Sequence, residues 1–280
     1  HPAGGGLPGH PGALVGAACA LVGTFLVLRR MSLLGDAISH SVLLGIVAVF
    51  FLTGERSPFF AVLGAGAVGL LTVSLVEMLN RTGLVKEDAA IGLVFPALFS
   101  LGVIFVSRFP AEVHIDVEHV LYGEIAYSAF DRVTMFGRDV GYRSFWTLGI
   151  MTAVNLAFIM LFYKELKLAT FDRGLAAALG FSPTLIHYLL LALVSATTVV
   201  SFDSVGAILV VAMLIVPAAT AYLLTDRLPV MIGLAVGLGC VSAVGGYWVA
   251  RWMDGSIAAA MAVVAGVCFV VAFMFAPRHG

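Results

Sequence analysis

Residues 29–45 read RRMSLLGDAISHSVLLG, in which an arginine pair ends one apolar run and two ionisable residues lie inside the next. In a helix, Asp36 and His40 are four positions apart and lie on the same face, about one turn from each other. A carboxylate and an imidazole placed in this way suit a borderline divalent ion such as manganese, iron or zinc. The alternative interpretation is that Asp36 caps the helix while His40 bonds a neighbouring carbonyl group.

The composition excludes a soluble protein. Hydrophobic residues make up 61% of the chain, charged residues only 11%, and the mean hydropathy is +1.08. A soluble domain carries about 25% charged residues, so this chain must be an integral membrane protein. Its apolar runs lack the alternation of a barrel strand, which predicts an α-helical bundle. Because ionisable side chains inside a membrane span are costly, Asp36 and His40 are candidates for function.

Charge and cysteine content exclude further classes. The formal net charge of −1 argues against nucleic acid as a partner. Cys19, Cys240 and Cys268 are far apart in apolar runs, so we interpret them as small core residues rather than a disulfide framework or thiolate site. Residues 1–11 are rich in Gly and Pro and do not begin with Met, so a flexible or engineered N-terminus is expected.

The sequence predicts an all-α integral membrane protein, a polytopic bundle of eight or nine transmembrane helices. One transmembrane domain over residues 12–276 is followed by a short tail at 277–280. Most candidate spans approach the length of about 20 residues that crosses the hydrocarbon, but 12–28 and 185–200 are short enough to be tilted, broken or partly interfacial. The candidate spans are 12–28, 36–53, 58–79, 89–107, 145–163, 185–200, 204–224, 228–250 and 256–276.

The distribution of Lys and Arg predicts the orientation, because these residues favour short cytoplasmic loops. In one assignment, Arg56 and Arg251 are the only Lys or Arg residues in the short loops on the external side. With nine spans this places the N-terminus outside and the C-terminus inside, whereas with eight spans one end of the assignment is wrong. The predicted cytoplasmic segments, rich in Lys and Arg, are 29–35, 80–88, 164–184, 225–227 and 277–280.

The longest segment between predicted spans, residues 108–144, is a polar loop and external in this assignment. It contains His114, Asp116, Glu118 and His119, whose side chains are of the types that bind transition metals. The alternatives are a solvated loop and a docking surface for an external partner.

A second segment outside the spans, residues 164–184, is predicted to contain a short cytoplasmic helix. Asp172 is a candidate N-cap, residues 174–179 support the helix, Gly180 closes it, and Pro183 opens the next span. A small polar linker would connect the two spans equally well. A capped helix here therefore indicates a lever that touches something in the cytoplasm.

Several familiar motifs are absent or out of context. Residues 64–69 match G-x-G-x-x-G but lie mid-span, so close helix packing explains them better, as it does Gly12–Gly16 and Gly233–Gly237. The sequence contains no G-x-x-x-x-G-K-S/T, G-x-S-x-G or H-E-x-x-H motif. The chain is therefore interpreted as a conduit, not an enzyme, whose energy comes from a partner.

Residues 201–221 form the other informative span. Gly206 and Pro217 bracket a helix that is expected to break or kink, and broken helices in membranes line cavities or are buried in protein. Asp203 lies at the outer end, where it either meets a cation or caps the helix. His187, near the inner end of the preceding span, is interpreted as structural.

Four segments together resemble the permease family of bacterial ABC importers for manganese, zinc or iron, the ABC-3 type. The resemblance extends from about residue 14 to residue 275, and its first and last segments are the most specific. The four segments are LRRMSLLGDAISH at 28–40, EDAAIGLV at 87–94, VLYGEI at 120–125 and VGAILVVAMLIVPAATA at 205–221.

The resemblance implies a type II importer fold in the bacterial plasma membrane and a dimer of permeases, identical or paralogous. Cytoplasmic ATP-binding subunits would hydrolyse ATP, an external solute-binding protein would deliver the ion, and no cofactor would be bound permanently. Tyr122, Gly123 and Glu124, with the His and acidic residues before them, are nearer the manganese branch than the zinc branch.

The resemblance also implies roles for individual residues. By position, Asp36 and His40 match the family's pair that lines the translocation path. Residues 120–125 match a region near the outer mouth. The segment that matches the coupling helix, which docks on the ATPase, contains Asp172, Arg173, Gly174, Leu179 and Gly180.

In such a dimer, two Asp36 and two His40 side chains would approach one axis and hold a manganese or zinc ion transiently. Because ligands must be deprotonated, transport is expected to fall as pH drops through the histidine range.

Two other classes compete with this interpretation. A secondary ion carrier predicts inverted repeats with matching broken helices, and no clear internal repeat is present. An intramembrane metalloenzyme at Asp36 and His40 would need a third ligand and a general base, and neither is evident. Co-purification of an ATPase would distinguish the importer from both.

Overall fold

The computed structural model describes residues 10–53, 58–108, 132–135 and 138–276, and nearly all of them are helical. Seven helices there are long and apolar enough to cross a membrane, and two shorter apolar segments are Gly12–Leu28 and Ile208–Leu224. The predicted polytopic helical bundle is confirmed, and each predicted span coincides with a helix. In chain order the elements are α1 (His10–Leu28), α2 (Leu33–Thr53), α3 (Pro58–Arg81), α4 (Glu87–Arg108), β1 (Arg132–Met135), β2 (Arg138–Tyr142), α6 (Arg143–Leu161), α7 (Tyr163–Phe171), α8 (Arg173–Ala178), α9 (Pro183–Val205), α10 (Ala207–Leu224), α11 (Leu228–Met253) and α12 (Ile257–Phe275).

Local signals in the sequence set several helix ends. The side chains of Ser182 and Ser256 accept backbone amides in the first turns of α9 and α12. Pro183 occupies the first turn of α9, where its missing N–H is not needed. These ends lie near the predicted ones because each depends on a few adjacent residues.

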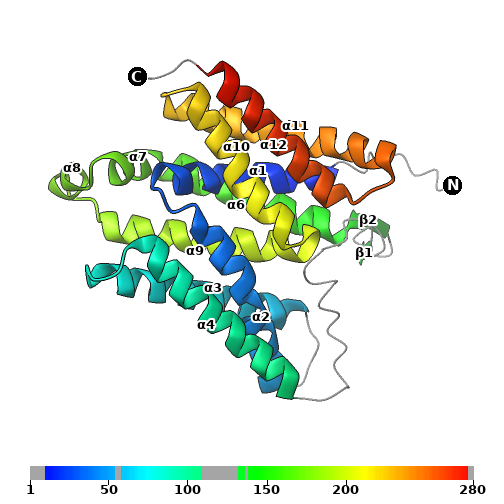
Figure 1. The fold of residues 1–280 in the computed structure, drawn as a ribbon, viewed down its shortest axis with the longest axis horizontal. Helices are drawn as coiled ribbons and strands as arrows, with labels where there is room; N and C mark the ends of the chain where they lie inside the picture. The colour runs from blue at the N-terminus through cyan, green and yellow to red at the C-terminus, as the bar shows by residue number, and fades with distance from the viewer. Residues whose placement is uncertain (1–9, 54–57, 109–131, 136–137, 277–280) are drawn as a thin grey trace.

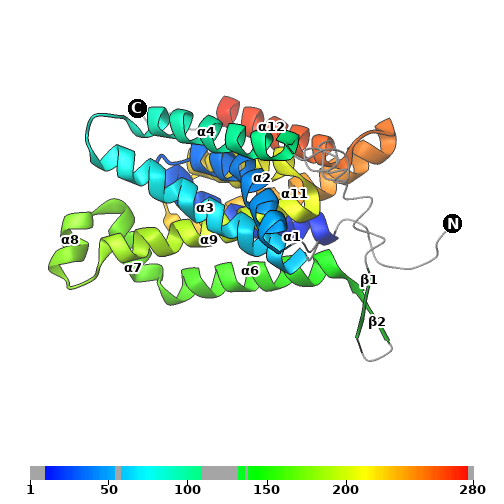
Figure 2. The same cartoon turned by 90° about the horizontal axis from the view of Figure 1, so that it is seen from below.

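The two ends of the bundle carry different connections (Figure 1; Figure 2). Both views show α8 and the α3–α4 connection at one end and the β1–β2 hairpin at the opposite end. A hydrogen bond from Arg29 to Thr170 of α7 places the α1–α2 connection at the α8 end as well. Three segments predicted to share one side of the membrane, 29–35, 80–88 and 164–184, are therefore at the same end.

The hairpin is an addition to the predicted all-helical fold. Strands β1 and β2 are antiparallel, with Thr134 opposite Asp139, and the chain enters α6 directly after β2. Of the predicted 108–144 loop, the structure describes the two strands, Arg108 at the end of α4 and the first two residues of α6. Residues 109–131 lie outside the described residues.

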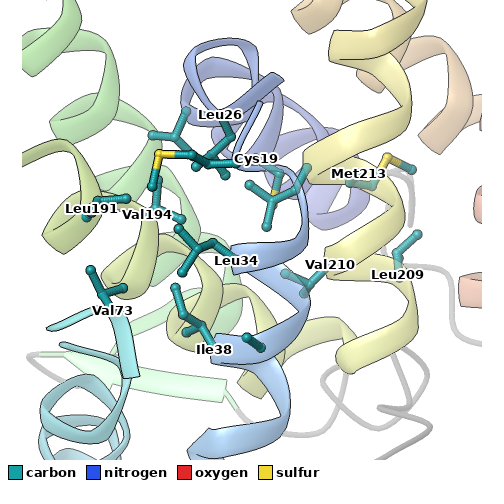
Figure 3. Close-up of a cluster of buried hydrophobic side chains, with 14 of the residues drawn as sticks. Cys19, Leu26, Leu34, Ile38, Val73, Leu191, Val194, Leu209, Val210 and Met213 are labelled. Carbon is teal, nitrogen blue, oxygen red and sulfur yellow. The ribbon is translucent and has the colours of Figure 1, made fainter. Parts of the chain in front are cut away.

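Helices α1 and α2 occupy the centre of the packing. Helix α1 contacts α6, α9, α10 and α11, and α2 contacts α3, α4, α9 and α10. Figure 3 shows side chains from five of these helices meeting in one buried cluster. Cys19, Ile38, Leu191 and Met213 in this cluster are almost fully buried, so Cys19 is a core residue as predicted.

Helices α1 and α11 approach so closely that their backbones touch. A Cβ atom on Gly16 would lie 2.7 Å from the carbonyl oxygen of Gly239. Nearby, Cys240 Sγ lies 3.9 Å from the carbonyl oxygen of Ala13, a residue 227 positions away in the chain. The predicted packing role is right for Gly16. It is wrong for Gly233 and Gly237, which have open space around them, because the contact with α1 is made by Gly239.

Helices α2 and α3 are also joined through small residues. Gly45 faces the backbone of Gly64, and any Cβ atom on either glycine would collide with the other helix. The Thr72 hydroxyl donates to Ser41 Oγ at 2.8 Å across the same interface. Gly64, the first glycine of the G-x-G-x-x-G match, thus serves helix packing, as predicted.

The predicted break in the chain occurs at Gly206. Helix α9 ends at Val205, α10 begins at Ala207, and Gly206 has a φ of 82°, a conformation that favours glycine. Pro217, in contrast, lies inside α10, which continues through it.

Candidate functional site

The predicted Asp36–His40 pair forms in the first part of α2. His40 Nε2 lies 3.4 Å from Asp36 Oδ1, one helical turn away. The capping alternative for Asp36 is wrong, because α2 already begins at Leu33 and Asp36 lies inside its first turn. At a rise of about 1.5 Å per residue, His40 lies roughly 10 Å into the helix.

Both side chains of the pair are accessible on the surface of the single chain. The Asp36 side chain is 43% exposed and the His40 side chain 30% exposed, although both belong to an apolar span. The His40 ring centroid lies 5.2 Å from that of Phe95 and 6.1 Å from that of Phe99, both on α4. The imidazole is thus supported by an aromatic wall while the pair stays open to a ligand.

The pair alone is too small to be a complete metal site. A tetrahedral site needs four ligands, and the described residues contain no group of three or more His, Cys, Asp and Glu that could hold an ion. Asp203 falls in the last turn of α9, but its side chain is outside the described part of the structure. The four other candidates, which are also outside it, are His114, Asp116, Glu118 and His119.

The predicted short helix is present as α8. Asp172 Oδ1 accepts the backbone amide of Leu175 at 2.8 Å, which is the N-cap bond that the sequence predicts. Gly180 ends the helix with a φ of 86°, and the amide of Phe181 bonds the carbonyl of Ala176 at 3.1 Å. Both ends of α8 are therefore fixed by its own sequence.

The sequence reasoning missed α7, which precedes α8 and continues the same segment. Leu166 and Ala169 anchor α7 by burial, and their helical spacing is the signal that could have found it. Phe171, Leu175 and Leu179 are 62%, 47% and 58% exposed. These apolar side chains are thus exposed at the end of the bundle where α8 lies (Figure 1).

A partly buried polar cluster next to α7, here called the Arg29 cluster, was also missed. Arg29 Nε donates to Thr170 Oγ1 at 3.2 Å, and Arg29 Nη1 donates to His187 Nδ1 at 3.0 Å. His187 Nε2 lies 3.3 Å from Glu77 Oε2, and Arg81 Nε donates to Glu77 Oε1 at 2.9 Å. The cluster joins the end of α1 to α7, α9 and α3.

Burial dominates the electrostatics of Arg29. It lowers the pKa of the Arg29 guanidinium to about 10, and repulsion from Arg173 adds to this effect. The group still carries its charge at neutral pH. Its Nη2 atom is buried and has no acceptor among the described residues. Sequence periodicity could not reveal this cluster, because His187 lies 158 positions from Arg29 and 110 from Glu77.

Known proteins resemble this chain over almost its whole length. A match to the ABC 3 transport family covers residues 10–276. The chain is 53% identical over 269 residues to the manganese transport system membrane protein MntD of Bacillus subtilis (strain 168), covering 96% of this chain and 91% of that protein. It is 51% identical over 267 residues to the zinc transport system membrane protein TroD of Treponema pallidum (strain Nichols), covering 95% and 72%.

A solved structure also resembles this chain over almost its whole length. PsaBC from Streptococcus pneumoniae, in complex with Fab, matches with a TM-score of 0.79 and 32% sequence identity, covering 97% of this chain and 91% of that one. The secondary-carrier and metalloenzyme alternatives are wrong, because the matched proteins are membrane permeases of ABC transport systems. The chain is a multi-pass protein of the bacterial plasma membrane and belongs to the ABC 3 transport family.

Proposed function

We propose that this chain is the permease of an ATP-driven importer that carries Mn²⁺ from a solute-binding protein into the cytoplasm. The Asp36–His40 pair carries the proposal, because an accessible carboxylate and imidazole inside an apolar span suit a path for divalent ions. Zinc or iron in the same class of importer is the alternative substrate. The name of the Bacillus subtilis relative supports manganese, and that of the Treponema pallidum relative supports zinc.

The incomplete ligand set favours a dimer. A two-fold axis beside α2 would bring two Asp36 and two His40 side chains together and supply four ligands. Such a site holds the ion for a short time only, since conduction requires binding that is easily reversed. It also covers the charged pair, which lipid would otherwise face at high cost.

The proposed partners would bind at opposite ends of the bundle. We place the ATP-binding subunit at α7–α8, where Phe171, Leu175 and Leu179 are exposed beside Arg173. The solute-binding protein would dock at the other end, where the β1–β2 hairpin lies (Figure 1; Figure 2). In this arrangement ATP binding moves α8, and the two permeases rock about their axis.

The decisive experiment measures cellular metal by mass spectrometry in cells that lack their own importers. The chain is expressed with its ATPase and binding protein, as wild type or with Asp36→Asn or His40→Gln, at matched membrane levels. We expect manganese to fall at least about tenfold in both variants, since even outer-shell changes at metal sites cost 10–100-fold. Asp88→Asn, an exposed acid on α4, is the charge-matched control and should accumulate manganese normally.

The other outcomes are equally informative. Normal accumulation in both variants would make the pair structural and put the ion elsewhere. Accumulation of zinc or iron in place of manganese by the wild type would keep the class of importer and change the substrate.

A further inference from the structure

The Arg29 cluster links α7, which lies at the proposed ATPase-binding surface, to α3, which packs against α2. We propose that Arg29, His187 and Glu77 are positioning residues that transmit the movement of α7–α8 to α2, the helix that carries Asp36 and His40. This inference rests on the proposed import function and assigns its coupling to a partly buried polar connection between helices.

The connection begins at α7. Arg29 directly follows α1, and its side chain donates a hydrogen bond to Thr170, one residue before the end of α7. Its guanidinium is largely buried, and the described residues offer no acceptor to Nη2. The bonds to Thr170 and His187 therefore hold the guanidinium in place, and displacement of α7 pulls directly on it.

His187 passes the connection from Arg29 to α3 in a defined protonation state. A guanidinium can only donate, so His187 Nδ1 must accept its hydrogen bond and the proton of the neutral imidazole is on Nε2. Nε2 then donates to Glu77 Oε2 at 3.3 Å. The imidazole thus has one accepting and one donating edge, each facing a different helix.

Glu77 completes the connection to α2 through α3. Thr72 lies on the same helix, about one and a half turns before Glu77. Its hydroxyl bonds Ser41, the residue after His40, and the Gly45–Gly64 contact locks the two helices further along. Because α2 and α3 are joined in this way, a shift of Glu77 moves the metal-binding helix.

The test compares two substitutions at one position. Glutamine offers one accepting oxygen and one donating nitrogen, as the neutral imidazole does, so His187→Gln can replace both bonds. His187→Leu can replace neither. Permease, ATPase and binding protein are reconstituted in proteoliposomes, and Mn²⁺ imported per ATP hydrolysed is measured. Thr198→Val is the matched control, since this buried hydroxyl on α9 has no partner among the described residues.

We expect His187→Leu to keep hydrolysing ATP while its import per ATP falls at least about fivefold, the low end of the range for allosteric coupling. His187→Gln and Thr198→Val should stay close to the wild type. Should His187→Leu not fold, Thr170→Val removes only the first bond and should lower import per ATP as well.

Two results would overturn the inference. One is that His187→Leu or Thr170→Val imports as much Mn²⁺ per ATP hydrolysed as the wild type. The other is equal loss of import and ATPase activity in His187→Leu and His187→Gln together with a lower melting temperature, which is the signature of a structural role. Failure of the proposed function is distinguishable, because the wild type itself would then import no Mn²⁺.

Discussion

Asp36 and His40 are polar partners of each other inside an apolar span. A lone carboxylate in an apolar span lacks water and a counter-charge, and the imidazole 3.4 Å away supplies a polar partner. Phe95 and Phe99 then hold that imidazole in one place. Because truncation of one partner leaves the other unpaired, Asn and Gln are better probes of this pair than Ala.

The proposed role of His40 as a metal ligand predicts a pH dependence of defined sign. Protonated imidazole cannot ligate a metal, so Mn²⁺ uptake should decrease as pH drops through the range in which His40 becomes protonated. Uptake is measured in proteoliposomes with the ATPase rate and delivery by the binding protein controlled at each pH. A flat response would argue against His40 as a ligand.

Among the elements, α1, α6 and α9 are joined by one buried asparagine. Asn155 of α6 is fully buried, its Nδ2 donates to the Ala18 carbonyl of α1 at 3.0 Å, and Thr197 of α9 donates to its Oδ1 at 3.1 Å. The amide therefore bridges three helices at one point.

Replacing this amide should weaken the bundle. We expect Asn155→Leu to lower the free energy of unfolding by about 1–2 kcal/mol, since it removes the buried hydrogen bonds to the Ala18 carbonyl and the Thr197 hydroxyl. Thermal unfolding in detergent measures the change, with Thr198→Val as a control that breaks no hydrogen bond seen among the described residues. Equal melting temperatures for Asn155→Leu and the wild type would contradict this assignment.

Helix α8 should depend on its caps. Asp172→Ala removes the bond to Leu175, a loss of about 1 kcal/mol, and Gly180→Ala forces a side chain into a left-handed conformation at roughly 1–2 kcal/mol. Both changes should speed amide hydrogen exchange in α8, which mass spectrometry resolves. Lys167→Ala, at an exposed position on α7, should leave that exchange unchanged.

Elements that depend on adjacent residues could be predicted from the sequence. The spans follow from the length of apolar runs, α8 from Asp172 and Gly180, and the break before α10 from Gly206. Helix α7 was missed because its charged residues resemble a connecting loop. The Arg29–His187–Glu77 contacts could not be predicted, because periodicity along the chain carries no information about which distant helices become neighbours.

At the scale of the whole molecule, the proposed dimer makes a geometric prediction. If the axis passes beside α2, the two copies of His40 lie near each other across it. In a variant with Cys19, Cys240 and Cys268 replaced, His40→Cys should therefore cross-link two protomers through a short bifunctional thiol reagent. The readout is the dimer band on a denaturing gel.

The position of the cross-link matters as much as its presence. Val267→Cys in the same background, on an exposed face of α12, should not cross-link if the axis is beside α2. A cross-link at residue 267 in place of residue 40 would move the axis to the other side of the bundle.

The contact between α1 and α11 has a consequence for biogenesis. Ala13 and Cys240 touch although 227 residues separate them, so α1 leaves the ribosome long before its neighbour exists. At a synthesis rate of about 5–20 residues per second, the wait lasts roughly 10–45 s. Throughout that time, lipid or an insertase must cover the glycine-lined face of α1. Ribosomes that stall before α11 would therefore release chains in which the α11-facing side of the first helix is uncovered, a feature that membrane quality control can recognise.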